Sequence, residues 1–189
     1  MFDYIYPDEN TISDVIANML DPSGTHGQGE KFLRNFLSEI GISINSDKVG
    51  VQIKREETTK YIRSALRRID ITIDFNNCER AIAIENKPWD GEQLDQVKDY
   101  IDHLSKKYKD NYVLVYLTGD GSEPQSIEQI LKVALIAEGR LRVIPYIPRL
   151  MNWLEVCFKD CQSEKMRLFL RDFMRYIENN FRRSFEEGD

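Results

Sequence analysis

AIAIENKPWDG, residues 81–91, begins as an apolar segment typical of a buried strand and ends in a group of polar and charged side chains. Side chains two positions apart in a strand lie on the same face of the sheet. Glu85 and Lys87 should therefore point the same way, with Asn86 pointing to the opposite face. A carboxylate and an ammonium together at the end of a core strand predict a functional site at this edge of the sheet.

The neighbouring segments predict an α/β domain with a mixed sheet. RIDITIDF (68–75) alternates apolar and polar residues and would pair with 81–86 through a short connection. YVLVYLT (112–118) is an apolar run that follows a crossover helix. In order, we expect helices over 12–20 and 32–40, strands over 49–56, 68–75 and 81–86, a helix over 94–104, a strand over 112–118, a helix over 127–134, a strand over 141–147 and a helical tail.

Three details of these helices can be checked against the structure. Thr11 is the expected N-cap of the first helix. Leu94 is the expected start of the apolar stripe on the crossover helix. The buried residues expected on the helix over 127–134 are Ile127, Ile130, Leu131 and Ala134, and the tail has a stripe that includes Phe169, Phe173, Ile177 and Phe181.

Length and charge limit the classes of protein that are possible. The chain has 189 residues, 41% of them hydrophobic, which is enough for one domain with a real core. We divide it into a core over 1–148 and a C-terminal helical extension over 149–189 that packs on the same domain. A net charge of −6 disfavours general nucleic-acid binding, although residues 51–70 hold six basic and three acidic residues.

Cysteine content and hydropathy predict a cytoplasmic protein. Cys78, Cys157 and Cys161 are an odd, sparse set that does not fit a disulfide framework. With only two histidines in the chain, a structural zinc site has too few obvious ligands. No apolar run approaches the length of a membrane span, and no basic leader follows Met1, so we expect no membrane partner.

Asp70 extends the group at the end of the 81–87 strand. If strands 68–75 and 81–86 pair, Asp70 and Glu85 can lie close together, although the pairing register cannot be derived from the sequence. Two neighbouring carboxylates repel each other, and a hard cation such as Mg²⁺ or Mn²⁺ relieves that repulsion. Such a metal makes its bound water a nucleophile, and Lys87 could orient that water or stabilise developing negative charge. The alternative is a simple ion pair between Glu85 and Lys87.

The acid at position 70 followed by Glu85-Asn86-Lys87 on the next strand resembles the PD-(D/E)xK nuclease superfamily. The resemblance implies a restriction-endonuclease-like αβββαβ core, with Asp70 and Glu85 as metal ligands. QVKDY (96–100) is similar to the Q-x-x-x-Y motif of the RecB-like branch, which adds Gln96 and Tyr100 to the catalytic group. The sequence departs from the family pattern at Ile69, where proline is expected, and at Asn86, for which we assign no role.

The N-terminal segment MLDPSGTHGQGEKFLRNFL (19–37) resembles the opening of a prokaryotic subfamily of these nucleases. The resemblance makes Glu30 a candidate third metal ligand, while the bland alternative is a solvated glutamate in the first turn of a helix. His26 could contact phosphate, but we favour a role in holding the turn. The implied setting is prokaryotic defence, restriction or repair.

These features predict a Mg²⁺- or Mn²⁺-dependent nuclease whose partner is nucleic acid, with DNA as the expected substrate. Candidate contacts to the phosphate backbone are the basic residues between the first two strands, for which a solvated hairpin tip is the alternative: Lys60, Arg63, Arg67 and Arg68. One rival function is a catalytically inactive nucleic-acid-binding module. Another is a homodimerisation module in which the aromatic stripe of the C-terminal helix forms the interface. DNA versus RNA and endonuclease versus exonuclease stay open.

Overall fold

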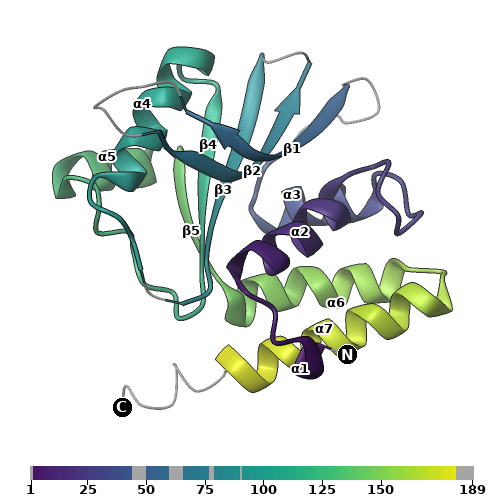
Figure 1. Cartoon of the computed structure of the whole chain (residues 1–189). Helices are drawn as coiled ribbons and strands as arrows, with labels where there is room; N and C mark the ends of the chain where they lie inside the picture. Colours follow the sequence, from purple (N-terminus) through teal and green to yellow (C-terminus); the bar gives the residue numbers. More distant parts are fainter. Residues whose placement is uncertain (1, 44–49, 60–65, 77–78, 90, 182–189) are drawn as a thin grey trace.

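The computed structural model describes residues 2–43, 50–59, 66–76, 79–89 and 91–181, and Lys60, Arg63 and Cys78 lie outside them. The fold is built on a five-stranded sheet with the strand order β1-β2-β3-β4-β5 (Figure 1). The first three strands form an antiparallel meander, and β4 and β5 join it in parallel. The mixed sheet of the prediction is confirmed. Its strands are β1 (Val51–Thr58), β2 (Arg68–Phe75), β3 (Arg80–Lys87), β4 (Tyr112–Thr118) and β5 (Leu141–Pro145).

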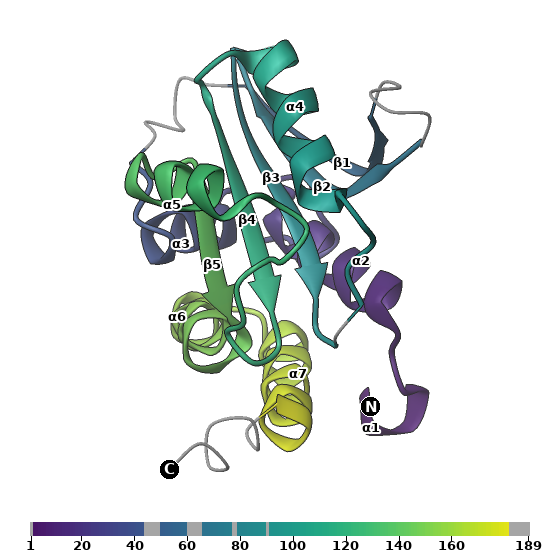
Figure 2. The same ribbon diagram turned by 90° about the vertical axis from the view of Figure 1, so that its left-hand side faces the viewer.

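Helices cover both faces of the sheet, and in Figure 2 the strands run from top to bottom with α4 and α5 in front of them. On one face lie α4 (Gln96–Tyr108) and α5 (Gln129–Ala137). The other helices pack on the opposite face and around its lower end: α1 (Phe2–Ile5), α2 (Glu9–Leu20), α3 (Lys31–Glu39), the short helical turn η2 (Tyr146–Leu150), α6 (Met151–Asp160) and α7 (Glu164–Phe181). Among the residues described, no helix combines the length and the apolar character that a membrane span needs.

Three expectations about helix boundaries and faces were wrong. Helix α2 begins at Glu9 with Asp8 as its N-cap, since the Asp8 carboxylate accepts the Thr11 backbone N–H (2.8 Å), and Thr11 lies inside the helix instead of capping it. Helix α4 begins at Gln96, which leaves Leu94 85% exposed. The third error concerns helix α5, which begins at Gln129 and exposes Ile130 while it buries Lys132 and Leu135, since periodicity on a short, mostly apolar helix does not define one face. Ile127 is buried as expected, just before this helix.

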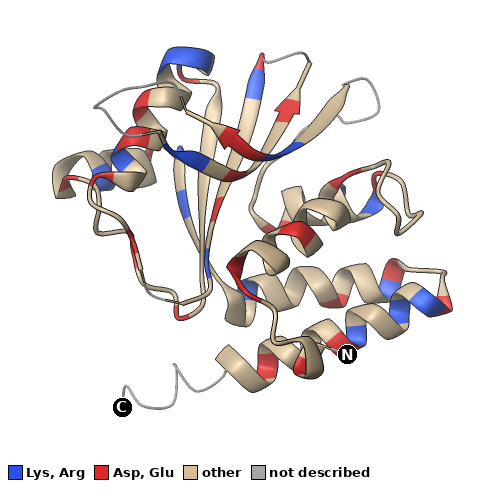
Figure 3. Cartoon of the chain, in the orientation of Figure 1, with Lys and Arg blue, Asp and Glu red and all other residues tan. Residues whose placement is uncertain are grey.

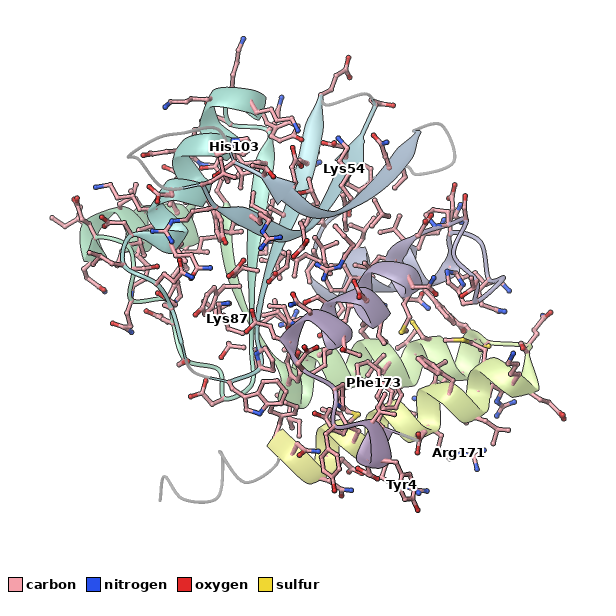
Figure 4. All side chains as sticks on the ribbon, viewed as in Figure 1. Tyr4, Lys54, Lys87, His103, Arg171 and Phe173 are labelled. Carbon is pink, nitrogen blue, oxygen red and sulfur yellow. The ribbon has the colours of Figure 1, made fainter. Side chains whose placement is uncertain are left out.

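The aromatic stripe of α7 belongs to the core. Phe173 (labelled in Figure 4), Ile177 and Phe181 are buried, and they pack in the same apolar cluster as α1, α2, α3 and α6. The rival hypothesis that this stripe forms a dimer interface is therefore wrong for these residues. Burying them inside the chain removes the apolar area that such an interface would need.

Asn86 connects the sheet to the helical layer on the side opposite Glu85. Its amide donates to Ser13 Oγ on α2 (2.9 Å), and its carbonyl oxygen accepts the Tyr146 hydroxyl (2.6 Å). All three side chains are buried. A buried amide that is hydrogen-bonded on both sides specifies how these layers pack, and this gives Asn86 the structural role that the sequence did not supply.

Asn86→Ala is expected to lower the free energy of unfolding by about 3 kcal/mol, because it leaves two buried hydroxyls without their partner. Urea denaturation measures this change. Asn18→Ala, at an exposed position on α2, is the matched control and should change the value by less than about 0.5 kcal/mol. Equal stability of the two variants would contradict the role given to Asn86.

Candidate active site

Asp70 lies at the point in strand β2 where the isoleucine side chains change from one face of the sheet to the other. Ile69 packs in the apolar cluster under α4, whereas Ile71 and Ile73 pack in the cluster on the opposite face. The described ladder to β3 begins at the next residue, with Ile71 opposite Ile84. Asp70 uses its carboxylate in place of a ladder bond, since Oδ2 accepts the backbone N–H of Asn86 (2.8 Å). This bond holds the acid beside the end of β3.

Glu85 and Lys87 point to the same face of the sheet, as the alternation predicts. Lys87 Nζ lies 3.1 Å from Glu85 Oε1 and 2.8 Å from Glu9 Oε1 on α2. Figure 4 shows Lys87 at the end of the sheet, next to α2. The ammonium is therefore held between two carboxylates that come from different layers of the fold.

Helix α4 supplies the third side of the group. Gln96 Nε2 donates to Glu85 Oε1 (2.5 Å) and to the Tyr100 hydroxyl oxygen (2.9 Å). The Tyr100 hydroxyl donates in turn to the backbone oxygen of Arg68 on β2 (2.7 Å). Residues four positions apart lie on one face of a helix, so Gln96 and Tyr100 together tie α4 to two strands and fix the position of Glu85.

These side chains line one polar pocket of about 360 Å³. Among the candidates from the sequence, the structure brings Asp70, Glu85, Lys87, Gln96 and Tyr100 to this pocket, and Arg67 and Arg68 to its rim. Glu9 also lines it, a residue that no sequence pattern singled out as part of the site. The available signal was the acidic first turn of α2, which was overlooked because the helix was expected to start three residues later.

Glu30 and His26 are not among the residues that line the pocket. Glu30 forms an ion pair with Arg34 one helical turn further on (3.0 Å). His26 Nε2 donates to the backbone oxygen of Asp21 (2.8 Å), its Nδ1 accepts the Gln28 backbone N–H (3.0 Å), and its ring stacks on Phe32. Both ring nitrogens therefore hold the turn between α2 and α3, which is the role predicted for this residue from the sequence.

A family model described as the PD-(D/E)XK nuclease superfamily matches residues 1–175. The chain belongs to the PD-(D/E)XK nuclease superfamily. Comparisons with curated proteins and with solved structures gave no match. Asp70 and the Glu85-Asn86-Lys87 triplet, which resemble the motif of this family, lie on adjacent antiparallel strands, β2 and β3, and Asp70, Glu85 and Lys87 line the pocket.

Burial dominates the electrostatics of this pocket. Desolvation, followed by the negative charge of Asp70, raises the pKa of Glu85 to about 8. Desolvation also raises the pKa of Asp70 above its usual value. The pKa of Lys87 is raised as well, because attraction to Glu85 and Glu9 outweighs the opposing effect of burial. Without a bound cation, the carboxyl group of Glu85 therefore takes up a proton more readily than an ordinary glutamate.

Residues of the pocket fit a divalent metal. Glu85 Oε2 is buried and has no hydrogen-bond partner among the residues described, and such an atom normally has one. No group of three or more His, Cys, Asp and Glu side chains in the described part of the chain is arranged to hold a metal. Mg²⁺, however, often takes only one or two carboxylates and completes its shell with water and substrate phosphate. Asp70 and Glu85 meet that requirement.

Arg67 and Arg68 are positioned differently at the rim. The Arg67 guanidinium donates to Asp99 Oδ2 (2.6 Å) and to Gln93 Oε1 (2.6 Å), so it is held against α4. Arg68 is exposed and pairs with Glu56 (3.1 Å). A weak exposed pair of this kind exchanges easily for a phosphate, whereas Arg67 mainly positions the segment before α4.

Proposed function

We propose that this PD-(D/E)XK nuclease hydrolyses phosphodiester bonds of DNA with the help of Mg²⁺ or Mn²⁺. The observation that supports the proposal best is the buried, unpartnered Oε2 of Glu85 beside Asp70, among the residues that the structure describes. Two neighbouring carboxylates with raised pKa values, the buried Glu85 and the half-buried Asp70, destabilise each other unless a proton or a cation compensates their charge. A divalent ion supplies that charge and, when bound, activates water for attack on phosphate.

The chain's own residues take distinct parts in this proposal. Asp70 and Glu85 hold the metal. Lys87, which is kept charged by its two carboxylate neighbours, stabilises the negative charge that develops on the phosphate. Gln96 and Tyr100 orient Glu85, and Glu9 orients Lys87. Arg68 is a candidate contact to the DNA backbone, which positions the strand without recognising its sequence.

The rival function is a nucleic-acid-binding module that has lost catalysis. Several buried polar side chains that are costly for stability converge on one pocket here, and a module that only binds has no need of them. Acidic and basic residues are also interspersed over the strands and helices drawn in Figure 3. Simple electrostatic binding favours a concentrated basic surface instead. The role in prokaryotic defence, restriction or repair stays a prediction.

Cleavage assays with purified protein test the proposal. Supercoiled plasmid, linear duplex, single-stranded DNA and RNA are incubated with Mg²⁺, Mn²⁺ or excess EDTA. We expect cleavage of DNA with either metal and none with EDTA. A Glu85→Gln preparation purified in parallel excludes a contaminating nuclease, because it should be inactive. Metal-independent cleavage, or binding of every substrate without cleavage under all conditions, would count against the proposal.

A further inference from the structure

A second cavity, of about 550 Å³, adjoins the catalytic pocket, and Lys87 lines both. It lies at the ends of β3 and β4, where Tyr116 pairs with Glu85 and Thr118 pairs with Lys87 in register. A polynucleotide whose phosphate is attacked beside Lys87 would therefore have a neighbouring nucleotide at the mouth of this cavity. The roles given above to the catalytic residues leave the cavity itself unused.

The walls of the second cavity are held in place by polar contacts. The Glu92 carboxylate accepts the Tyr116 hydroxyl and the backbone N–H groups of Gln125 and Ser126, so it joins the segment after β3 to the segment after β4. Lys132 on α5 donates to the backbone oxygen of Pro124 (3.2 Å). A cavity whose walls are fixed in this way is formed before any ligand binds.

Gly119 sets the closest approach of the two segments that form the cavity. Its backbone N–H donates to the Lys87 oxygen (3.1 Å), and a Cβ at this position would lie 2.1 Å from the backbone oxygen of Pro88. Only glycine allows the end of β4 to lie this close to the turn that follows β3. The position of Trp89 beside the cavity depends on this contact.

Trp89 provides a large apolar surface at the mouth of the cavity. The residue is 44% exposed, and its ring lies 5.9 Å from the Phe181 ring (centroid to centroid) on one side. Phe181 also packs on Tyr146 (4.6 Å) and Tyr176 (6.4 Å), so its burial does not depend on Trp89 alone. An exposed indole next to a polar catalytic pocket is suited to stacking on a base.

The charges of the cavity distinguish a base from a phosphate. Glu92, Asp120 and Glu123 line it, and Lys87 is the only basic residue among the described residues that do so. Lys132 compensates Glu123 through an ion pair (3.0 Å), but Glu92 and Asp120 still disfavour a phosphate there, because like charges repel. The Asp120 carboxylate, with the side-chain amide oxygens of Gln125 and Asn180, can accept hydrogen bonds from the amino groups of cytosine, adenine or guanine.

We propose that this cavity binds an unpaired nucleobase next to the cleaved phosphate, with Trp89 stacked on the base. The proposal rests on the nuclease function proposed above and adds a substrate class to it. A base inside an intact duplex cannot enter a side pocket without leaving its stack, which costs free energy. The preferred substrate is therefore single-stranded, or has an overhang or a frayed end at the site of cleavage.

Trp89→Ala tests the stacking contact. With Mg²⁺ and single-stranded DNA, we expect this variant to raise KM about 10-fold and to leave kcat within about two-fold, because stacking contributes to binding. A DNA substrate that lacks the base next to the cleaved phosphate should raise the KM of the wild-type protein by a similar factor. The same substrate should not raise the KM of Trp89→Ala any further. Trp89→Phe should restore most of the loss. Tyr4→Ala removes another exposed aromatic side chain, 87% exposed on α1, and should have no effect.

Two outcomes would overturn the proposal while leaving nuclease function intact: an unchanged KM for Trp89→Ala, or an equal loss on normal and abasic DNA. Base binding can also be tested without cleavage, so that its failure is distinguished from failure of the nuclease function. For this test, Trp fluorescence is followed as single-stranded DNA is added to the Glu85→Gln protein. Trp153 is buried and Trp89 is exposed, so a quench that is lost in Trp89→Phe supports base binding without any cleavage. Absence of that quench overturns the proposal.

Discussion

Glu85→Gln should lower nuclease turnover by at least about 10³-fold and, at the same time, raise the free energy of unfolding at pH 8 by about 2 kcal/mol. Turnover falls because a neutral amide is a poor ligand for Mg²⁺. Stability rises because the substitution removes a buried charge but leaves an oxygen that can still accept from Gln96 and Lys87. Opposite effects on activity and stability are the expected signature of a residue kept for catalysis.

The pH dependence of this gain in stability follows from the pKa of Glu85, about 8 in the folded chain against an ordinary 4.5. Between these values the folded state binds the proton and the unfolded state does not. The stability of the wild-type protein therefore falls as pH rises through that window. The amide introduced by Glu85→Gln does not titrate, so the difference between the two proteins should be small at pH 5 and should grow up to pH 8.

Urea denaturation in EDTA across pH 5–9 measures the stability effect of Glu85→Gln, and cleavage of DNA with Mg²⁺ measures its activity. Glu155→Gln, at an exposed position on α6, is the matched control and should change neither quantity. If Glu85→Gln cleaves DNA at the wild-type rate, Glu85 is not a metal ligand. A loss of stability that is equal at all pH values would contradict the assigned protonation.

Lys87→Met is expected to lower turnover by about 10³-fold, because it removes the positive charge that would stabilise the developing negative charge on the phosphate. Methionine keeps most of the length and the apolar stem of the side chain. Binding of Mn²⁺, measured by EPR or calorimetry, should persist or become tighter, since a cation that repels the metal is lost. Retained metal binding with lost turnover separates the role of Lys87 from those of Asp70 and Glu85.

Lys87→Met should also lower the free energy of unfolding, by about 3 kcal/mol at pH 9 and by less at pH 6, because Glu85 and Glu9 lose the cation that they share. At pH 6 Glu85 can hold a proton, so the loss of the Lys87 charge destabilises the folded state less. In a Glu85→Gln background most of this cost should disappear, which a double-mutant cycle would measure. Lys159→Met on α6 serves as the exposed control. Wild-type turnover by Lys87→Met would remove this residue from the mechanism.

Local sequence patterns predicted the strands of the site well. The bounds of β2 and β4 coincide with the predicted 68–75 and 112–118, because alternation and continuous apolar runs follow directly from the two-residue repeat of a strand. The same repeat placed Glu85 and Lys87 on one face and Asn86 on the other. The spacing of Gln96 and Tyr100 likewise placed both on one face of α4.

Local patterns predicted helix ends and partners poorly. Thr11 as a cap, Leu94 as a helical residue and the buried face of α5 were wrong, since caps and faces depend on what each helix packs against. Glu30 was a candidate because of its motif, and Glu9 was missed. Both are acids near the start of a helix, and only the packing of α2 against β3 brings Glu9 to Lys87.

By itself, the sequence determined the α/β class, the strand that ends in Glu85-Asn86-Lys87, and the alternation that separates Asn86 from its neighbours. These features depend on backbone geometry within a few residues. Only the tertiary structure decided that Asp70 bonds to the Asn86 backbone, that Glu9 reaches Lys87, and that a second cavity with Trp89 at its mouth adjoins the pocket. Such contacts join distant segments, and their free energy depends on register and packing that no local pattern contains.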